Sequence, residues 1–189
     1  MSYRIYSTKG FLLWSTPSGE TSKTYLIYTE DFGLIRARAQ GVRLLASKLR
    51  YSLTDYSFLS LSLVRGKEFW RITGAAPETP VALATTGSDA APSRAMQNAR
   101  ARIFSLTKRL VQGEEKNDRL FAALSGLFES EVPAEDMQAF ESLILARALS
   151  VLGYLDIERL VPDNSLATAK ANIKSIVPAI NKALQESQL

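Results

Sequence analysis

Two absences narrow the chemistry that this chain can perform. Its 189 residues include no cysteine and no histidine. Thiolate nucleophiles, disulfides, Cys/His zinc sites and histidine acid–base catalysis are therefore excluded. The acidic residues fall mostly at expected helix starts or solvent faces, as at Glu114 and Asp136, and do not form a convergent metal-binding set. We expect a protein that is not an enzyme and that uses no metal or cofactor.

Positive charge is concentrated in the first 76 residues of the sequence. The chain has 23 basic and 19 acidic residues, a formal net charge of +4. Residues 1–76 hold 11 basic and 5 acidic residues, a net charge of +6, and the remaining residues carry −2. Between Phe32 and Thr54 there are five cations and no acid. Because nothing nearby in sequence neutralises them, a polyanion is the expected partner, and the excess of arginine favours phosphate. A solvated basic surface without a ligand is the alternative.

Eleven residues are candidate nucleic-acid contacts. Arg36 and Arg38 are expected on one face of a strand, and the connection that follows carries further cations able to follow successive phosphates. Tyr51, beside Arg50, is the best candidate for stacking on a base. The candidates are Arg36, Arg38, Arg43, Lys48, Arg50, Lys23, Arg65, Lys67, Arg71, Lys9 and Tyr51.

Several of these candidates also have an ordinary structural interpretation. Lys48 or Arg50 could cover apolar surface with its stem or pair with Asp55. Glu20 and Glu68 lie close enough in sequence to pair with some of the remaining cations. The other aromatic residues of the first half are expected in the core, because aromatic residues at strand spacing are usually buried; they are Tyr25, Tyr28, Tyr56, Phe69 and Trp70.

Strands must position these candidates, because the first 76 residues alternate between apolar and polar with a period of two. In the third expected strand Arg36 and Arg38 alternate with apolar residues such as Ala37. Five strands in fewer than 80 residues, with a longer connection between the third and fourth, predict an OB-type barrel, with an SH3-like barrel as the alternative. The strands are expected at residues 3–16, with or without a kink at Lys9-Gly10, and at 23–29, 34–41, 55–65 and 68–74.

Beyond the strands the apolar period changes to 3.6, which predicts helices. Ser93 is expected to cap the first of them, another should begin at Pro133 and end at Gly153, and Pro178 should kink or split a last helix over 164–188. The predicted fold class is α+β, with an N-terminal OB-fold barrel followed by an all-helical domain. The expected boundaries are 1–76 for the barrel, 77–92 for a linker rich in Ala, Thr, Pro and Gly, and 93–189 for the helical domain.

The composition predicts a soluble cytoplasmic protein. Hydrophobic residues make up 46% of the chain and charged residues 22%. The longest apolar runs, such as Ser142–Gly153, are interrupted by a charge at Arg147 and are too short to span a bilayer. No membrane partner is expected, and no signal peptide is recognisable.

An ordered set of short motifs over residues 9–76 resembles bacterial RecO. Each motif is weak alone, but their order is specific. The motifs are Gly19-Glu20-Thr21-Ser22, Tyr28-Thr29-Glu30-Asp31-Phe32-Gly33, Ala39-Gln40-Gly41-Val42-Arg43, Ser47-Lys48-Leu49-Arg50, Ser57-Phe58-Leu59, Leu63-Val64-Arg65-Gly66 and Trp70-Arg71-Ile72.

The resemblance implies a non-catalytic recombination mediator that binds single- and double-stranded DNA and anneals complementary strands. It also implies two protein partners, RecR and single-stranded DNA-binding protein, a role in helping RecA to load on DNA, and association with the nucleoid. The charge asymmetry agrees, because Lys and Arg on phosphates give sequence-independent, salt-sensitive affinity. A protein-interaction adaptor and an RNA-binding barrel are the alternatives, since phosphate contacts do not reveal the sugar.

Two features depart from the family pattern. Many relatives carry a four-cysteine zinc module in the helical half, which this chain cannot form because it has no cysteine. Relatives that bind the tail of single-stranded DNA-binding protein carry a basic residue just before a Phe-Glu pair, whereas here Gln138 and Ala139 precede Phe140-Glu141.

Overall fold

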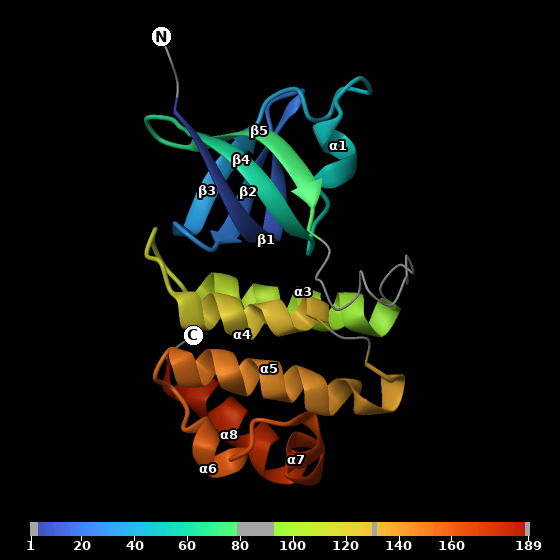
Figure 1. Cartoon of the computed structure of the whole chain (residues 1–189), viewed down its shortest axis with the longest axis vertical. Helices are drawn as coiled ribbons and strands as arrows, with labels where there is room; N and C mark the ends of the chain where they lie inside the picture. Colours follow the sequence, from blue (N-terminus) through green and yellow to red (C-terminus); the bar gives the residue numbers. More distant parts are fainter. Residues whose placement is uncertain (1–3, 79–92, 130–131, 188–189) are drawn as a thin grey trace. The chain divides into compact units, whose positions relative to one another are not determined.

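Five strands close into a barrel in the computed structural model of the protein, which describes residues 4–78, 93–129 and 132–187 (Figure 1). The strand order is β1-β2-β3-β5-β4, and β1 pairs with β4 to complete the closure. Only β3 and β5 pair in parallel, so the barrel is mixed. The bounds are β1 (Ile5–Ser18), β2 (Ser22–Thr29), β3 (Gly33–Ala39), α1 (Leu49–Ser52), β4 (Phe58–Arg65) and β5 (Trp70–Pro77). This strand order and the helix between β3 and β4 confirm the OB-like barrel over the SH3-like alternative.

The interior of the barrel is filled by every second residue of its strands. In β3, Ile35, Ala37 and Ala39 are fully buried, whereas Arg36 is exposed. The same alternation buries three leucines of β4, each of which stabilises the fold by about 1.5–3 kcal/mol. The barrel core consists of Leu12, Tyr25, Ile27, Ile35, Ala37, Ala39, Val42, Leu53, Leu59, Leu61, Leu63, Trp70 and Ile72.

The first strand is continuous across the expected kink. β1 runs from Ile5 to Ser18 with Gly10 inside it, where an added Cβ would lie 2.9 Å from Cγ2 of Ile27. Glycine therefore serves close packing at this point and does not break the strand. The irregularity of β1 lies farther on, where a β-bulge shifts its register between Leu12 and Trp14. The bulge leaves Trp14 43% exposed on the outer surface.

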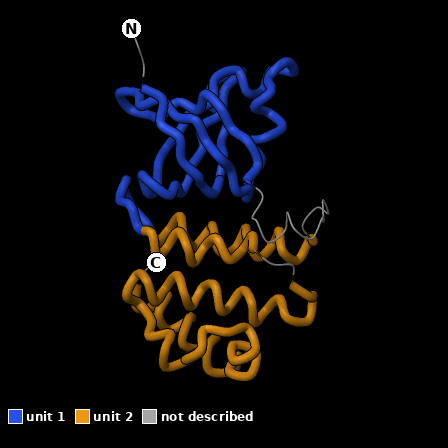
Figure 2. Tube along the Cα trace, viewed as in Figure 1, with its two compact units in different colours: residues 1–79, 111–117 blue, residues 80–110, 118–189 orange. Residues whose placement is uncertain are grey.

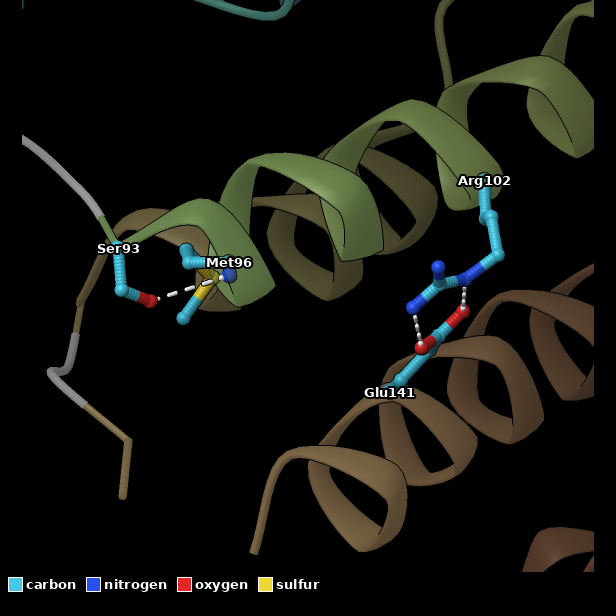
Figure 3. Close-up of polar contacts among 4 residues, drawn as sticks. All are labelled: Ser93, Met96, Arg102 and Glu141. Carbon is cyan, nitrogen blue, oxygen red and sulfur yellow. Dashed lines mark hydrogen bonds and ion pairs between the residues drawn. The ribbon is translucent and has the colours of Figure 1, made fainter. Parts of the chain in front are cut away.

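The second half of the described chain is helical, as predicted. Ser93 caps the first helix, because its hydroxyl accepts a hydrogen bond from the backbone N–H of Met96 at 3.2 Å (Figure 3). The expected helix after Pro133 is present as a 3-10 turn that continues into a long α-helix. The elements are α3 (Arg94–Leu110), α4 (Asp118–Glu129), η1 (Ala134–Asp136), α5 (Met137–Val151), α6 (Ile157–Leu160), α7 (Leu166–Ala171) and α8 (Ile173–Glu186).

Arginine side chains join these helices to one another. Arg102 of α3 donates two hydrogen bonds of 2.6 Å to the carboxylate of Glu141 on α5 (Figure 3). Arg100 donates to the carbonyl of Leu127, near the end of α4, at 3.0 and 3.3 Å, and its guanidinium lies 3.9 Å from the centre of the Phe128 ring. These cations therefore serve helix packing and capping.

Pro178 was expected to kink or split the last helix, and it does not split it. The break lies at Asn172, which ends α7 and begins α8, and Pro178 lies inside α8. The side chain of Asn172 donates a hydrogen bond of 2.9 Å to the carbonyl of Leu160, which stabilises the break. The missing N–H of Pro178 removes one intrahelical bond, and α8 continues past it.

The chain divides into two compact units, each made of two separate segments of the sequence (Figure 2). Unit 1 contains residues 1–79 together with 111–117, and unit 2 contains residues 80–110 and 118–189. The segment 111–117 connects two helices in sequence but packs with the barrel. Of the expected linker, residues 79–92 lie outside the described residues, and β5 runs to Pro77.

Candidate nucleic-acid interface

Three of the candidate arginines lie together on the outer face of β3 and β5, and we call Arg36, Arg38 and Arg71 the basic wall. Arg36 and Arg38 alternate with the buried residues of β3, so both point away from the core. Arg38 and Arg71 are paired across the parallel β3–β5 ladder. The Nη2 atom of Arg38 donates to the carbonyl of Ser18 at 3.5 Å. The wall therefore presents adjacent cations on the outer surface of β3 and β5, and β3 belongs to the strand 2–3 face with which OB folds bind nucleic acids.

Three further candidates line a pocket at one end of the barrel. The cationic pocket has a volume of about 240 Å³ and is lined by Lys23, Tyr25, Val42, Arg43, Arg50 and Leu53. Arg43 is held there by two hydrogen bonds: its backbone N–H donates to Thr21 at 2.9 Å, and its Nη1 donates to the carbonyl of Gly19 at 3.2 Å. Three positive side chains around one small hollow form a site whose charge suits phosphate.

Tyr25 contributes a neutral hydroxyl to the pocket. The residue is 1% exposed, and its burial raises the pKa of the phenol to about 12, with a smaller contribution from Asp55. The group therefore remains protonated at neutral pH. A neutral O–H can donate a hydrogen bond to an anion without adding negative charge of its own.

The remaining candidates differ in whether their side chains are exposed or already paired within the protein. Lys48 and Tyr51 are exposed on and beside α1, with Tyr51 at 77%. Lys67 is exposed in the turn between β4 and β5. Lys9, in contrast, forms an ion pair of 2.5 Å with Glu78, and this hydrogen bond raises the pKa of Lys9 above its usual value. Its charge is already partly neutralised.

Arg65 is also engaged, and its partner lies far away in sequence. Glu114 forms an ion pair with Arg65 at 3.1 Å and accepts a hydrogen bond of 3.1 Å from Nε1 of Trp70. The guanidinium of Arg65 also lies 4.9 Å from the centre of the Trp70 ring. The sequence suggested Glu68 as the neutralising neighbour, but the carboxylate comes from the segment 111–117.

Sequence reasoning missed one aromatic residue of this surface and misplaced another. Trp14 pairs with Leu26 across β1 and β2, and Leu26 pairs with Arg36 across β2 and β3, which places Trp14 on the same row as the basic wall. The bulge in β1 that exposes Trp14 has no signal in the alternating pattern. Phe69, expected in the core, is 40% exposed, whereas Tyr25, Tyr28 and Trp70 are buried as predicted.

The cations of the wall and pocket share one electrostatic property. Among the described residues, none of the six lies within 4 Å of a carboxylate oxygen in an ion pair. The described part of the chain also contains no group of three or more Asp, Glu, His or Cys residues able to hold a metal ion. The chemistry that the arrangement offers is therefore binding of an anion by unneutralised cations.

Comparison with known proteins identifies the barrel. Residues 1–80 match the family model described as Recombination protein O N terminal. The barrel is similar to the N-terminal domain of RecO. Two similar relatives are both named DNA repair protein RecO and come from Dehalococcoides mccartyi: the protein of strain BAV1 is 36% identical over 69 residues and that of strain 195 is 33% identical over the same length.

The match to these RecO proteins is confined to the barrel. It covers 36% of this chain and 27% of each relative, so the chain aligns with about a quarter of their length. The matched family confirms the resemblance carried by the motifs over residues 9–76. Among the described residues, no helix is both long enough and apolar enough to cross a bilayer.

Proposed function

We propose that this RecO-type barrel binds the phosphate backbone of DNA and that the protein acts in DNA repair without catalysing a covalent reaction. The observation that carries the proposal is the set of six cations on the wall and pocket that the described carboxylates do not neutralise. Such a surface supplies affinity that depends little on sequence and strongly on salt. The names of the relatives, DNA repair protein RecO, support DNA as the polyanion.

The test is a salt titration of DNA binding by fluorescence anisotropy with a labelled 30-mer single strand. Replacing Arg36, Arg38 and Arg43 by Ala should weaken binding to all sequences alike and reduce the slope of log K against log salt by about 0.7 for each lost contact. The matched control removes the same charge from unit 2 through Arg159, Lys174 and Lys182 and should leave the slope unchanged. An equal slope in the wild type and the barrel variant would refute the proposal.

We further propose that the bound strands are annealed and that the protein assists RecA loading together with RecR. A surface that neutralises phosphates lowers the repulsion between two complementary strands and thereby favours their pairing. The check is the rate at which labelled complementary strands form duplex, with and without the barrel variant, and addition of RecR and RecA to strands covered by single-stranded DNA-binding protein. Equal binding of a matched RNA strand would favour the RNA-binding alternative.

A pocket of unit 2 supports a second, interaction-based function. It has a volume of about 210 Å³, and its lining includes Phe140, Leu143 and Leu166 with Arg147 at one side. Arg147 donates hydrogen bonds of 2.8 and 2.6 Å to Asn164, which fixes the guanidinium, and burial lowers its pKa below the usual value. The lining also includes Glu129, so an acidic, apolar peptide such as the tail of single-stranded DNA-binding protein would place its apolar side chain in the pocket and its negative group on the side of Arg147.

This second function has its own test. A labelled peptide ending in two aspartates, leucine and phenylalanine should bind the wild-type protein, and Phe140→Ala should weaken that binding about tenfold without affecting DNA binding. Tyr154→Ala, at an exposed aromatic residue outside the pocket lining, is the control. Peptide binding that survives Phe140→Ala would place the site elsewhere.

A further inference from the structure

The loop between β3 and α1 carries an unusual group of exposed apolar side chains. Leu44 is 52% exposed, Leu45 is 82% exposed, and Tyr51 on α1 is 77% exposed. We call these three residues the apolar tip. Isolated exposed apolar residues are common on protein surfaces, but a group of three on one short segment marks a binding surface.

Backbone hydrogen bonds fix the loop that carries the apolar tip. Successive backbone hydrogen bonds join Leu44 N–H to Gly41, Ser47 N–H to Leu44 and Arg50 N–H to Ser47, at 3.0, 3.1 and 3.3 Å. Gly41, with φ of +64°, begins this run of turns, and its N–H donates to Oγ of Ser22 at 3.4 Å. Because the loop is fixed in this way, the leucines are presented to a partner in a defined position.

The apolar tip is continuous in sequence with two arginines of the cationic pocket. Arg43 lines the pocket and is followed by Leu44 and Leu45, and Arg50 lines the pocket and is followed by Tyr51. α1 packs on the barrel next to β5, so both ends of the loop are anchored (Figure 1). Leu44 and Tyr51 each directly follow a pocket arginine in the sequence, so a ligand with a negative group in the pocket has apolar and aromatic side chains available from the adjoining residues. A nucleotide has this combination, with a phosphate next to a flat apolar base.

We propose that the apolar tip inserts between bases while the cationic pocket holds the neighbouring phosphate, so that the barrel prefers DNA with unstacked bases beside a duplex. This inference rests on the proposed DNA binding. Apolar side chains inserted between base steps are a known means of unstacking them, and the cost is lowest where the bases are already unpaired. The absence of any acid between Phe32 and Thr54 favours a nucleic acid at this surface.

The experiment uses the full chain and three DNA molecules: a hairpin with a single-stranded tail, a blunt duplex of the same stem and a single strand. A 2-aminopurine at the first paired position of the tailed hairpin reports unstacking by a rise in fluorescence. The wild-type protein should produce this rise and prefer the tailed hairpin to the blunt duplex. Leu44→Ser with Leu45→Ser should reduce both the rise and the preference about fivefold while changing affinity for the blunt duplex less than about twofold.

Two further variants make the result specific. Tyr51→Ala should reduce the preference through lost stacking on a base, which is worth about a tenfold change in affinity. Ile5→Ser is the matched control, because it removes an exposed apolar residue, 63% exposed, from β1 of the same barrel. It should change neither the fluorescence rise nor the preference. Circular dichroism and urea unfolding of each variant confirm that the fold is kept.

The outcomes separate this inference from the proposed function. DNA binding by the wild type without a fluorescence rise, or an equal loss of affinity for all three DNA molecules in the leucine variant, overturns the inference and leaves DNA binding intact. Absence of binding to any of the three overturns both. If the leucine variant loses binding of an acidic, apolar peptide and keeps its behaviour on DNA, the tip serves a protein partner and the inference is wrong.

Discussion

The arginines of the barrel and those of the helical unit occupy opposite kinds of environment. In unit 2, Arg100, Arg102 and Arg147 each make short contacts to carbonyls, carboxylates or amides of neighbouring elements. On the basic wall, the side chains of Arg36 and Arg71 form no such hydrogen bond or ion pair with the described residues and are exposed to solvent. The comparison teaches that positive charge alone does not mark an interface, because a cation used in packing is not available to a phosphate.

The largest expected effect contrasts one arginine from each environment. Arg100→Ala should lower the free energy of unfolding by about 2–3 kcal/mol, because two hydrogen bonds and the contact with the ring of Phe128 are lost. Its DNA affinity should change less than about twofold. Arg36→Ala should do the reverse, with stability within about 0.5 kcal/mol and clearly weaker DNA binding. Urea unfolding and anisotropy measure the two quantities, and a reversed pattern breaks the comparison.

The next effect concerns Tyr25, the neutral tyrosine that lines the cationic pocket. The pKa of Tyr25 is about 12 in the folded protein and about 10 in the unfolded chain, because burial disfavours the phenolate. The folded state therefore retains this proton longer, so the stabilisation is fully present below pH 10 and is lost as the pH rises towards 12. We expect the wild type to lose about 2 kcal/mol more than Tyr25→Phe over this range.

Unfolding in urea at several pH values between 9 and 12 checks this difference. Tyr154→Phe controls for the loss of a hydroxyl at an exposed position in unit 2. Parallel stability curves for the wild type and Tyr25→Phe would show that the hydroxyl is not desolvated by the barrel.

A smaller effect is expected when the Arg102–Glu141 pair is broken. Glu141→Gln removes the charge from a carboxylate whose arginine partner is 57% exposed, so the loss of stability should be about 0.5–1 kcal/mol. DNA affinity should stay constant, because the pair belongs to the packing of α3 on α5. A rise in DNA affinity after Arg102 loses its ion pair would contradict the assignment of this arginine to helix packing alone. Thermal unfolding and anisotropy are the measurements.

The smallest effect should come from Glu114→Gln, which frees Arg65 within the barrel. The amide can still accept the hydrogen bond from Trp70, while the charge opposite Arg65 disappears. Affinity for the single strand should rise about two- to threefold and the salt slope by at most about one contact, roughly 0.7. Unaltered binding would mean that Arg65 lies off the DNA path even when its charge is free.

The alternating sequence pattern predicted the strands of the barrel but did not predict contacts between residues far apart in the chain. The alternation of Ile35, Arg36 and Ala37 directly encodes which side chains face the core, so β3 and the exposure of its arginines could be predicted. The pairing of Arg65 with Glu114 could not, because it joins residues far apart in the chain through a loop with no periodic signal.

The same reasoning explains two local errors. The exposure of Trp14 depends on a bulge that shifts the phase of β1, and a simple period of two does not anticipate it. The break at Asn172 is stabilised by a side-chain bond to Leu160, a tertiary contact that the helical pattern does not reveal, and α8 continues through Pro178.

The segment 111–117 also has a consequence for biosynthesis. The Cβ of an alanine at Gly33, where φ is +62°, would clash with the carbonyl oxygen of Glu115, and Leu34 N–H donates to the carbonyl of Gly113 at 3.2 Å. Residues translated long after the last strand therefore pack on the barrel. A ribosome-bound chain that ends in β5 therefore has its five strands but lacks this cover over Trp70. The barrel reaches its final form only after α3 has emerged, which couples its maturation to synthesis of the helical unit.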